Sequence, residues 1–246
     1  MNKKFELEEN HYGNLHNIKM TCDCPLTKKN IHPPFANASF FSLLTGPPGS
    51  GKTTFLFNML QKQKKDSNIY YRVFKDIIYV CPKSSRSTVE NNPLAELEPG
   101  SVFDEMSYEV QDKIIENKEK YDEKKEKHYN QLLILDDCSA YLKDKTTLKI
   151  LSELSKNRRH LSLSIIILVQ DLIDVPKTVR RQISSLIMFK PSNNDDLETL
   201  RKEFINIKKP EFQELANYVF KEKHDNLFVN RANNEIFKNL QRIIMN

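Results

Sequence analysis

The segment of residues 46–53, Gly-Pro-Pro-Gly-Ser-Gly-Lys-Thr, constrains the fold of this 246-residue chain more than any other feature. It fits the pattern Gly-x-x-x-x-Gly-Lys-Ser/Thr, in which glycines let backbone N–H groups converge on phosphate oxygens. Three of the chain's five glycines lie within it, although glycine is otherwise scarce. An apolar run at 40–44 precedes the segment, and apolar residues at helical spacing follow it over 52–65. The sequence therefore predicts a buried strand, a phosphate-binding loop and a helix, in that order.

The residue types in this loop predict which part of the ligand each side chain binds. We expect the Lys52 amine to reach the β- and γ-phosphates of ATP and the Thr53 hydroxyl to bind Mg²⁺. The helix that begins near Gly51 adds the positive end of its dipole to the same site. The predicted nucleotide-binding residues are Gly46, Pro47, Pro48, Gly49, Ser50, Gly51, Lys52, Thr53 and Thr54.

Two aspartates follow a second apolar run, at 132–135, as in a Walker B motif. A buried strand in a parallel sheet places its last carboxylates at the carboxyl edge of the sheet, where the phosphate loop also lies. There Asp136 is expected to hold Mg²⁺, and Asp137 to orient or deprotonate the attacking water. An apolar run that ends in an acid is common, so the two aspartates alone are weak evidence for a Walker B motif. The evidence becomes strong because Lys52 of the phosphate-binding loop lies 84 residues before Asp136.

Further apolar runs at 77–81, 165–169 and 186–189 alternate with helix-like segments at 146–156 and 172–182. This pattern is typical of an α/β fold with a mainly parallel sheet and helices on both faces. Because the run at 77–81 lies between the two Walker motifs in the chain, we expect that strand to be inserted between them. This arrangement is that of an additional-strand P-loop NTPase.

The remaining sequence suggests an arm at 1–36, an ATPase core at 37–192 and an extension of the same domain at 193–246. The extension is predicted to hold helices at 195–204 and 210–220 and an edge strand at 227–229. Six acids and six bases interleave over 112–127, which predicts a solvated helix or a mobile insertion rather than a DNA-binding surface.

The sequence also argues against secretion and membrane insertion. Its longest uncharged apolar run, at 161–169, is about nine residues, whereas a membrane span needs about 20. The first ten residues turn acidic where a secretory signal would be apolar. We therefore expect reduced thiols inside a cell, with a metal site at Cys22 and Cys24 as the alternative.

Two polar features lie between the Walker B motif and the apolar run at 186–189, which is the last run of the core. Gln170 follows the run at 165–169. In ATPases of the additional-strand type, a polar side chain at this place lies between the Walker motifs and senses the γ-phosphate. The alternative is that Gln170 simply begins a loop. The segment Asn157-Arg158-Arg159-His160 precedes that run. An arginine supplied in trans is worth about 10³ to 10⁵ in rate, but two adjacent arginines equally fit a surface cluster or a DNA contact.

Together, residues 46–53, 132–137, 157–160 and 165–170 resemble the FtsK/HerA superfamily, specifically the genome-packaging ATPases of large DNA viruses and virophages, of the poxvirus and virophage type. The resemblance covers residues 39–190. It implies a RecA/FtsK/HerA-like fold, ATP and Mg²⁺ as cofactors, and hydrolysis that drives double-stranded DNA into a preformed capsid. It also implies a homo-oligomeric ring, pentamer or hexamer, that works with capsid or portal-vertex proteins in the viral factory of the host cytoplasm or in the virion.

The family pattern assigns Arg159, which precedes His160, as the arginine finger and Gln170 as the sensor. Two departures matter. Asp137 stands where many relatives outside the virus group carry glutamate, and Arg158 stands where glycine is familiar, so the choice between Arg158 and Arg159 stays open.

Candidate DNA contacts, expected in loops after strands, are Lys143, Lys145, Arg180 and Arg181. Contacts of this kind reach phosphates, so DNA binding should weaken steeply with salt. Two other functions remain as alternatives: a nucleotide kinase, whose phosphate loop often reads Gly-x-Pro-Gly-Ser-Gly-Lys, and a non-catalytic ATP-dependent switch for assembly or DNA partition. The Asp136-Asp137 pair after an inserted strand argues against the kinase.

Overall fold

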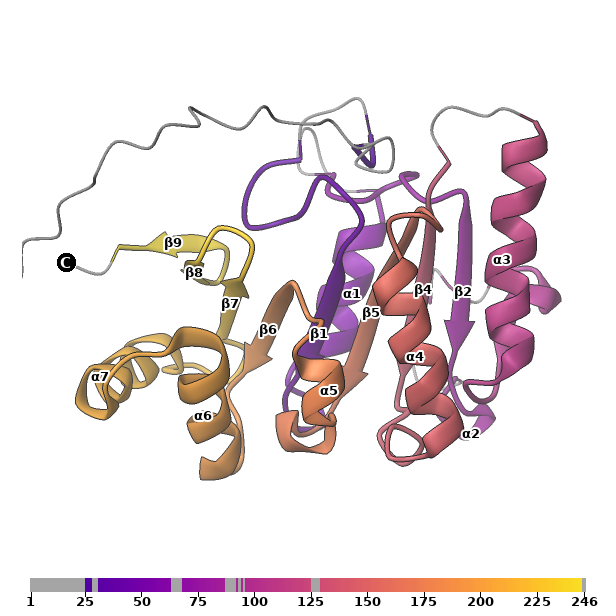
Figure 1. Cartoon of the computed structure of the whole chain (residues 1–246). Coiled ribbons are helices and arrows are strands. Elements are labelled where there is room, and N and C mark those ends of the chain that lie inside the picture. Colours follow the sequence, from indigo (N-terminus) through magenta and orange to yellow (C-terminus); the bar gives the residue numbers. More distant parts are fainter. Residues whose placement is uncertain are drawn as a thin grey trace, which may run out of the picture.

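A nine-stranded sheet covered by helices on both faces organises the described part of the chain (Figure 1). The computed structural model describes residues 25–27, 31–62, 68–86, 92, 94, 96–124 and 129–244. The strands are β1 (Phe41–Thr45), β2 (Asp76–Val80), β3 (Val102–Phe103), β4 (Gln131–Asp136), β5 (Leu163–Val169), β6 (Ser185–Phe189), β7 (Asn226–Asn230), β8 (Glu235–Lys238) and β9 (Gln241–Ile243). The α-helices are α1 (Lys52–Leu60), α2 (Lys83–Arg86), α3 (Tyr108–Glu123), α4 (Lys145–Asn157), α5 (Lys177–Arg180), α6 (Asn194–Leu200) and α7 (Lys209–Val219). Short helical turns lie at η1 (Pro99–Ser101), η2 (Leu172–Asp174) and η3 (Arg201–Ile205).

The strand order is β3-β2-β4-β5-β1-β6-β7-β8-β9. Strands β1 to β6 pair in parallel, whereas β7, β8 and β9 continue the sheet in antiparallel pairs. The continuous apolar runs of the core explain the parallel part, because a strand covered on both faces needs apolar side chains on both. The predicted fold class, a mainly parallel α/β sheet of the additional-strand type, is confirmed.

The strand that separates the two Walker strands is β5, so the expectation that residues 77–81 fill this place is wrong. β5 pairs with β1 on one side and with β4 on the other, while β2 lies beyond β4. All seven residues of β5 are buried, whereas β2 begins with two half-buried residues. The central position is therefore taken by the longest fully buried strand, and order along the chain does not decide it.

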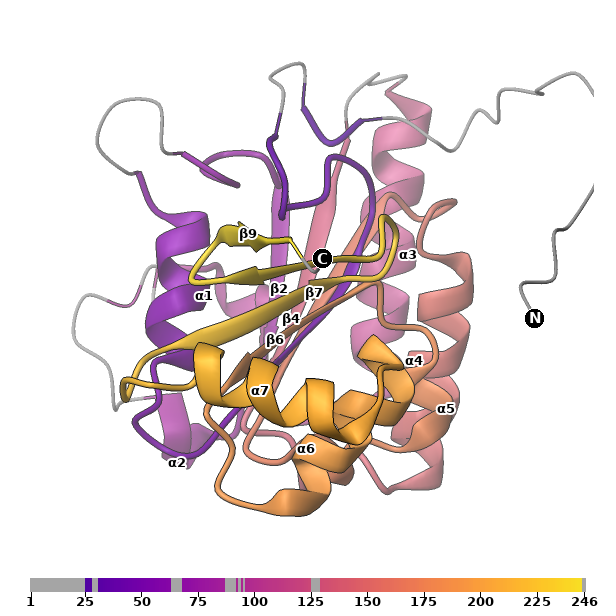
Figure 2. The same cartoon turned by 90° about the vertical axis from the view of Figure 1, so that its left-hand side faces the viewer.

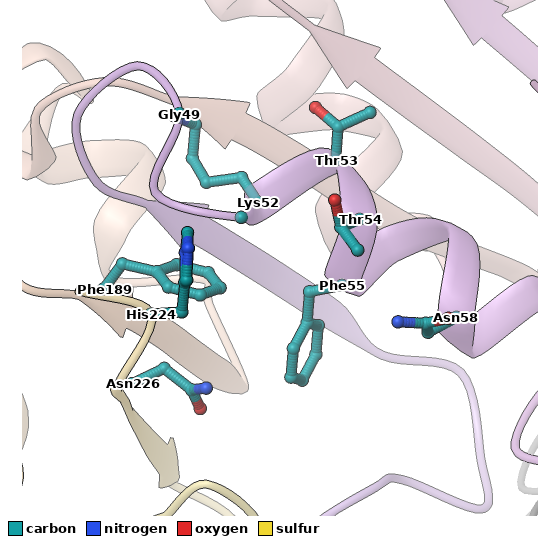
Figure 3. A pocket seen from close by; sticks show the side chains of 10 residues that line it. Gly49, Lys52, Thr53, Thr54, Phe55, Asn58, Phe189, His224 and Asn226 are labelled. Carbon is teal, nitrogen blue, oxygen red and sulfur yellow. The ribbon is translucent and has the colours of Figure 1, made fainter. Parts of the chain in front are cut away.

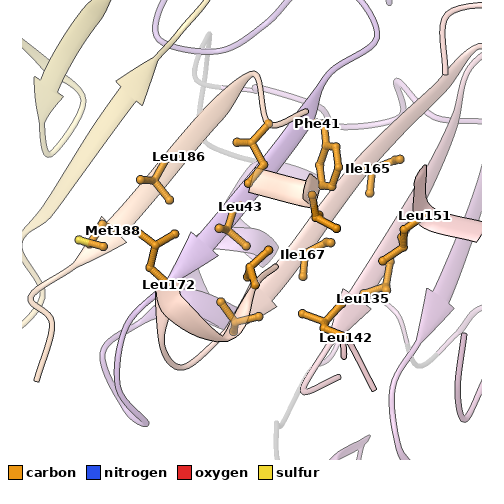
Figure 4. Packing of buried hydrophobic residues seen from close by; sticks show 14 of the residues in the cluster. Phe41, Leu43, Leu135, Leu142, Leu151, Ile165, Ile167, Leu172, Leu186 and Met188 are labelled. Atoms are coloured by element: carbon orange, nitrogen blue, oxygen red, sulfur yellow. The ribbon is translucent and has the colours of Figure 1, made fainter. Parts of the chain in front are cut away.

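Alternate side chains of the strands enter two separate cores. On one face Leu43 and Ile167 belong to the core covered by α3 to α7 (Figure 4). On the other face Leu44 and Leu168 belong to the core covered by α1. The turned view shows α1 on one side of the sheet and α3 and α4 on the other (Figure 2). Two buried cores on one sheet fix the register of the central strands, since a one-residue slip would exchange every side chain between the faces.

Replacing Ile167 with alanine tests this core. The side chain is fully buried, and removing a buried isoleucine down to Cβ costs about 2 to 5 kcal/mol of unfolding free energy. The matched control is Ile244→Ala, because that side chain is 78% exposed and should change stability little. Urea unfolding of both variants measures the difference, and equal stabilities would contradict the central position of β5.

The extension at 193–246 differs in part from its prediction. The helix expected at 195–204 is α6 followed by the π-helical turn η3, and the one at 210–220 is α7. However, β7 is not an edge strand, because it lies between β6 and β8, and the end of the order is β9. The predicted segment at 172–182 likewise holds η2 and α5 rather than one helix.

The structure agrees only in part with the expectations for the charged segment and for the N-terminal arm. Residues 112–123 of the charged segment belong to α3, which is not solvated all round, because Val110 and Ile114 are fully buried. Of the residues in the arm, Leu26 is buried and the Phe35 ring lies 5.6 Å from the ring of Phe228, so the described residues of the arm pack on the core.

Residues 22 and 24, the two cysteines considered for a metal, lie outside the described residues. No helix in the described ranges has the length and apolar character needed to cross a membrane.

Candidate functional site

The loop between β1 and α1 has the backbone that its glycines predict. Gly46, Gly49 and Gly51 have φ angles of 151°, 69° and 111°, in the region that residues with a Cβ rarely adopt. A Cβ atom on Gly46 would also lie 2.8 Å from the Cβ of Phe189. The Gly46 amide donates to the carbonyl of Gln170 at 3.1 Å, which ties the loop to the end of β5. This curled backbone at the start of a helix suits a phosphate chain.

Lys52 lies at the centre of the predicted site. Its amine donates to the carbonyl oxygens of Gly46 at 2.5 Å and Pro47 at 3.1 Å, so it folds back over the loop. Burial lowers the pKa of the Lys52 amine, and the nearby carboxylates of Asp136, Asp137 and Asp171 oppose this shift. The structure thus brings the predicted phosphate-binding lysine and both Walker B aspartates to one edge of the sheet.

The two Walker B aspartates have different environments. Asp136 accepts a hydrogen bond from the Tyr79 hydroxyl at 3.2 Å, and burial raises the pKa of its carboxyl. Asp137 follows β4 with a φ angle of 53° and accepts a hydrogen bond from the Ser85 hydroxyl at 2.5 Å. A side chain at the end of β2 or in α2 therefore touches each aspartate. Neither contact follows from the sequence, because the position of β2 beside β4 creates both.

The donor set suits magnesium. The Thr53 hydroxyl and the Asp136 carboxylate are the hard oxygen ligands that Mg²⁺ prefers. The described residues contain no group of three or more His, Cys, Asp or Glu side chains that would hold a metal ion alone. Mg²⁺ needs no such cage, since it is commonly bound through one or two side chains together with substrate phosphates.

Gln170 lies where a sensor between the Walker motifs is expected. It follows β5, which separates β1 from β4, and its carbonyl accepts hydrogen bonds from the Gly46 amide and, at 3.3 Å, from the Thr45 hydroxyl. Its side chain is exposed. The next residue, Asp171, faces Lys52 and accepts a hydrogen bond from Asn193 at 2.8 Å. Sequence reasoning missed Asp171, although an acid directly after the predicted sensor, Gln170, was a visible signal.

The arginine pair lies at the opposite edge of the sheet from the phosphate loop. Both residues follow α4 and precede β5, and the carbonyl of nearby Ser162 accepts from the amide of Gln131 at the start of β4. Arg158 is half-buried and donates to the Ser155 carbonyl at 2.8 Å, whereas Arg159 is exposed. Neither arginine is therefore placed beside the phosphate loop of its own chain.

The candidate DNA contacts divide between both edges of the sheet. Lys143 and Lys145 follow β4 at its carboxyl end. The Arg180 carbonyl instead accepts from Arg231, which follows β7 at the amino end of β6. Lys143, Lys145 and Arg181 are exposed, although Lys143 is paired with Asp174 at 3.0 Å.

Arg180 differs from the other three. It donates two hydrogen bonds of 2.8 Å to Glu203 and one of 2.6 Å to the Val175 carbonyl. Its side chain is 11% exposed. The guanidinium group thus ties α5 to η3, and a buried arginine paired in this way is engaged in the fold.

A cavity of about 460 Å³ adjoins the phosphate loop on the side of β6 and β7 (Figure 3). Besides loop and α1 residues it is lined by Phe189 at the end of β6 and by His224 and Asn226 at the start of β7. The His224 Nδ1 atom lies 2.9 Å from the Ser50 carbonyl, which links the extension to the loop. The sequence carried no signal for this cavity, because its walls are more than 130 residues apart in the chain.

Comparisons with known proteins agree with this geometry. The chain resembles the genome packaging NTPase B204 of Sulfolobus turreted icosahedral virus 2 solved with ATP-gammaS, with a TM-score of 0.56 and 18% identity over 83% of this chain and 98% of that one. It also resembles ATPases 2 and 3 of EssC from Geobacillus thermodenitrificans, with a TM-score of 0.55 and 13% identity over 82% of this chain and 39% of that one. A third match is the pCW3 conjugation coupling protein TcpA, with a TM-score of 0.53 and 16% identity over 84% of this chain and 60% of that one.

At these identities the solved structures establish the fold. No curated protein gives a significant match to the sequence. A family model described as Poxvirus A32 protein, however, matches residues 32–245, nearly the whole chain. The chain belongs to the poxvirus A32 protein family.

Proposed function

We propose that this protein is an ATP-hydrolysing motor that moves double-stranded DNA into a preformed capsid. The observation that carries the proposal is the meeting of Lys52, Asp136, Asp137 and Gln170 at one edge of the sheet, in a chain whose family model spans residues 32–245. The similarity to the genome packaging NTPase B204 supports it. A nucleotide kinase fits less well, because β5 separates the two Walker strands.

The geometry supports a role for each of these residues. The loop of residues 46–54 holds the phosphates, and its Lys52 stabilises the charge that develops on the transferred phosphoryl group. Thr53 and Asp136 would hold Mg²⁺, which neutralises phosphate charge when bound. Asp137 orients and deprotonates the attacking water, and the Gln170 side chain reports the presence of the γ-phosphate to the strands on both sides. An aspartate base at this place is compatible with hydrolysis when the water lies close to it.

A ring of subunits supplies what a single chain lacks. Arg159 lies at the edge opposite its own phosphate loop and is exposed, so we assign it to the nucleotide of the neighbouring subunit. Arg158 is half-buried and bonded to its own helix, which favours Arg159 of the two. We expect a homo-oligomeric ring, a pentamer or hexamer, that docks on capsid or portal-vertex proteins in the host cytoplasm or in the virion.

DNA is expected to contact exposed cations through its phosphates. Lys143, Lys145 and Arg181 remain candidates, whereas we leave out Arg180 because its guanidinium group is paired with Glu203.

The proposal is tested by the steady-state ATPase rate with and without linear double-stranded DNA, with light scattering to size the assemblies. We expect DNA to stimulate hydrolysis in samples that contain rings. A monomer whose rate ignores DNA would argue for the kinase, and nucleotide acceptors would then reveal it. Very slow turnover with nucleotide-dependent self-association would instead argue for the switch.

The position of Arg159 makes a prediction about mixed rings. Arg159→Ala subunits keep an intact phosphate loop, and Lys52→Ala subunits keep an intact finger, so each lacks what the other supplies. Mixing two inactive variants should therefore restore part of the ATPase rate, with a maximum at intermediate ratios. Lys156→Ala, which removes an exposed cation from the last turn of α4, just before Arg159, is the control and should be active alone. Absence of rescue at every ratio would contradict a role in trans.

A further inference from the structure

Strand β2 carries a buried tyrosine hydroxyl close to the carboxyl edge of the sheet. Tyr79 lies in β2, which pairs in parallel with the Walker B strand β4 (Figure 1). Tyr79 is 4% exposed, and its ring belongs to the core covered by α1. Phenylalanine would fill the same space without a polar group. Because a buried hydroxyl is unfavourable without a hydrogen bond, the partner of this hydroxyl indicates its role.

The register of β2 and β4 places this hydroxyl beside Asp136. Tyr79 is paired with Ile134, and Asp136 shares the face of Ile134 because side chains two residues apart in a strand lie on one face. That face is covered by α1, whose first turn carries Lys52 and Thr53. The Tyr79 hydroxyl donates to the Asp136 Oδ2 atom at 3.2 Å. The contact therefore joins the tyrosine to the carboxylate proposed to bind Mg²⁺.

Hydrogen bonds from a side chain and from the backbone hold the Asp136 carboxylate. The first comes from the Tyr79 hydroxyl and the second from the amide of Asp137. An ionised carboxylate offers about four lone-pair sites, so these two bonds limit its rotation and still leave sites for a cation. Mg²⁺ needs near-ideal octahedral geometry, so the orientation of each ligand matters for its binding. Losing a hydrogen-bond partner of a metal ligand typically costs about 10- to 100-fold in metal affinity.

We propose that Tyr79 is a positioning residue for the metal site, whose hydroxyl holds the Asp136 carboxylate in the orientation that binds Mg²⁺. The inference rests on the proposed function, since it requires Asp136 to be a ligand of the ion. Tyr79 acts through Asp136 and touches neither the ion nor the phosphates. The loop of residues 46–54 should therefore bind nucleotide phosphates without it. Strand β2 becomes a part of the site, although no sequence motif marks it.

Tyr79→Phe tests this inference, because it removes the hydroxyl and keeps the ring in the core. The probe is Mn²⁺, which suits the same oxygen ligands as Mg²⁺ and whose free form gives a signal in electron paramagnetic resonance. Mn²⁺ is titrated into the full chain in the presence of ADP, with the chain in excess over ADP. We expect Tyr79→Phe to bind Mn²⁺ about tenfold more weakly than the unaltered chain. Equal affinities for Mn²⁺ would overturn the inference.

Two further measurements separate positioning from damage to the fold. Calorimetric titration with ADP in EDTA reports the phosphate loop without an ion, and Tyr79→Phe should match the unaltered chain there to within about twofold. A parallel loss of ADP affinity in EDTA would overturn the positioning role. The matched control is Tyr70→Phe, because Tyr70 is 3% exposed and its hydroxyl donates to the Ala36 carbonyl at 3.0 Å. It should bind Mn²⁺ as the unaltered chain does, and an equal loss in both variants would contradict a specific role for Tyr79.

A double mutant tests whether the effect passes through Asp136. Asp136→Ala removes the ligand, so adding Tyr79→Phe to it should weaken Mn²⁺ binding by less than about twofold, since residues that act through one another are not additive. A second loss of about tenfold in the double mutant would contradict action through Asp136. Mn²⁺ binding that ignores Tyr79→Phe would contradict this inference alone, whereas failure of the unaltered chain to bind ADP and Mn²⁺ would contradict the proposed ATPase as well.

Discussion

Lys52→Ala is expected to lower the ATPase rate by at least about 10² to 10³, the range seen when a preorganised group that stabilises transition-state charge is removed. The amine lies over the loop, bonded to the Gly46 and Pro47 carbonyls, with three carboxylates near it. No other lysine lines the cavity at this loop, so nothing in the described chain replaces its charge. The loss should appear in nucleotide affinity as well as in turnover.

The control for this variant is Lys120→Ala, which removes an exposed cation from α3, away from the loop. Both proteins should keep the thermal unfolding midpoint of the unaltered chain within a few degrees, so that a lost rate reflects chemistry. The rate is measured by phosphate release at saturating ATP. An unchanged rate in Lys52→Ala would overturn the assignment of the whole site.

Asp137→Asn is expected to separate binding from chemistry. The amide keeps the shape of the side chain and can still bond to the Ser85 hydroxyl, which lies 2.5 Å from the carboxylate. It cannot accept the proton of the attacking water, and general-base catalysis contributes about 10² to 10⁴ in rate. ATP should therefore bind with nearly unchanged affinity while turnover falls by that factor.

The measurement for Asp137→Asn pairs a single-turnover hydrolysis assay with equilibrium binding of a fluorescent ATP analogue. Asp122→Asn, at an exposed site on α3, is the matched control and should hydrolyse ATP normally. Retained turnover in Asp137→Asn would assign the base to another acid, and Asp171 would be next, since it also faces Lys52. Lost binding would indicate that Asp137 holds the nucleotide rather than the water.

Local patterns in the sequence identified most of the core. The phosphate loop, both Walker B aspartates and Gln170 were predicted because each motif combines a local backbone preference with its neighbouring apolar strand. Strand order is not needed to predict that these motifs lie close together, since the carboxyl ends of parallel strands meet at one edge of the sheet.

Contacts that depend on strand order were not predictable in this way. The sequence gives β2 and β5 the same apolar signal, so the place of β5 between β1 and β4 appears only in the fold. The contact of Ser85 with Asp137 depends on β2 lying beside β4. The burial of Arg180 against Glu203 depends on η3 packing near α5. The sequence alone does not distinguish a basic residue that is paired in the fold from one that is exposed.

The extension shows the same limit. Its strand β7 was expected at an edge of the sheet, yet β8 and β9 pair beyond it. The hydrogen bonds that join Asn226, Asn239 and Asp225 form only when β7 and β8 make their hairpin. Polar residues that satisfy one another over such distances carry no periodic signal.

We expect ATP hydrolysis to move the protein along DNA, and displacement of a third strand measures that movement. A labelled oligonucleotide bound as a triplex near one end of a linear duplex is released when a motor travels through it. We predict release that requires ATP and is absent with a non-hydrolysable analogue or with Lys52→Ala. DNA-stimulated hydrolysis by assembled rings without any release of the third strand would contradict a translocating motor.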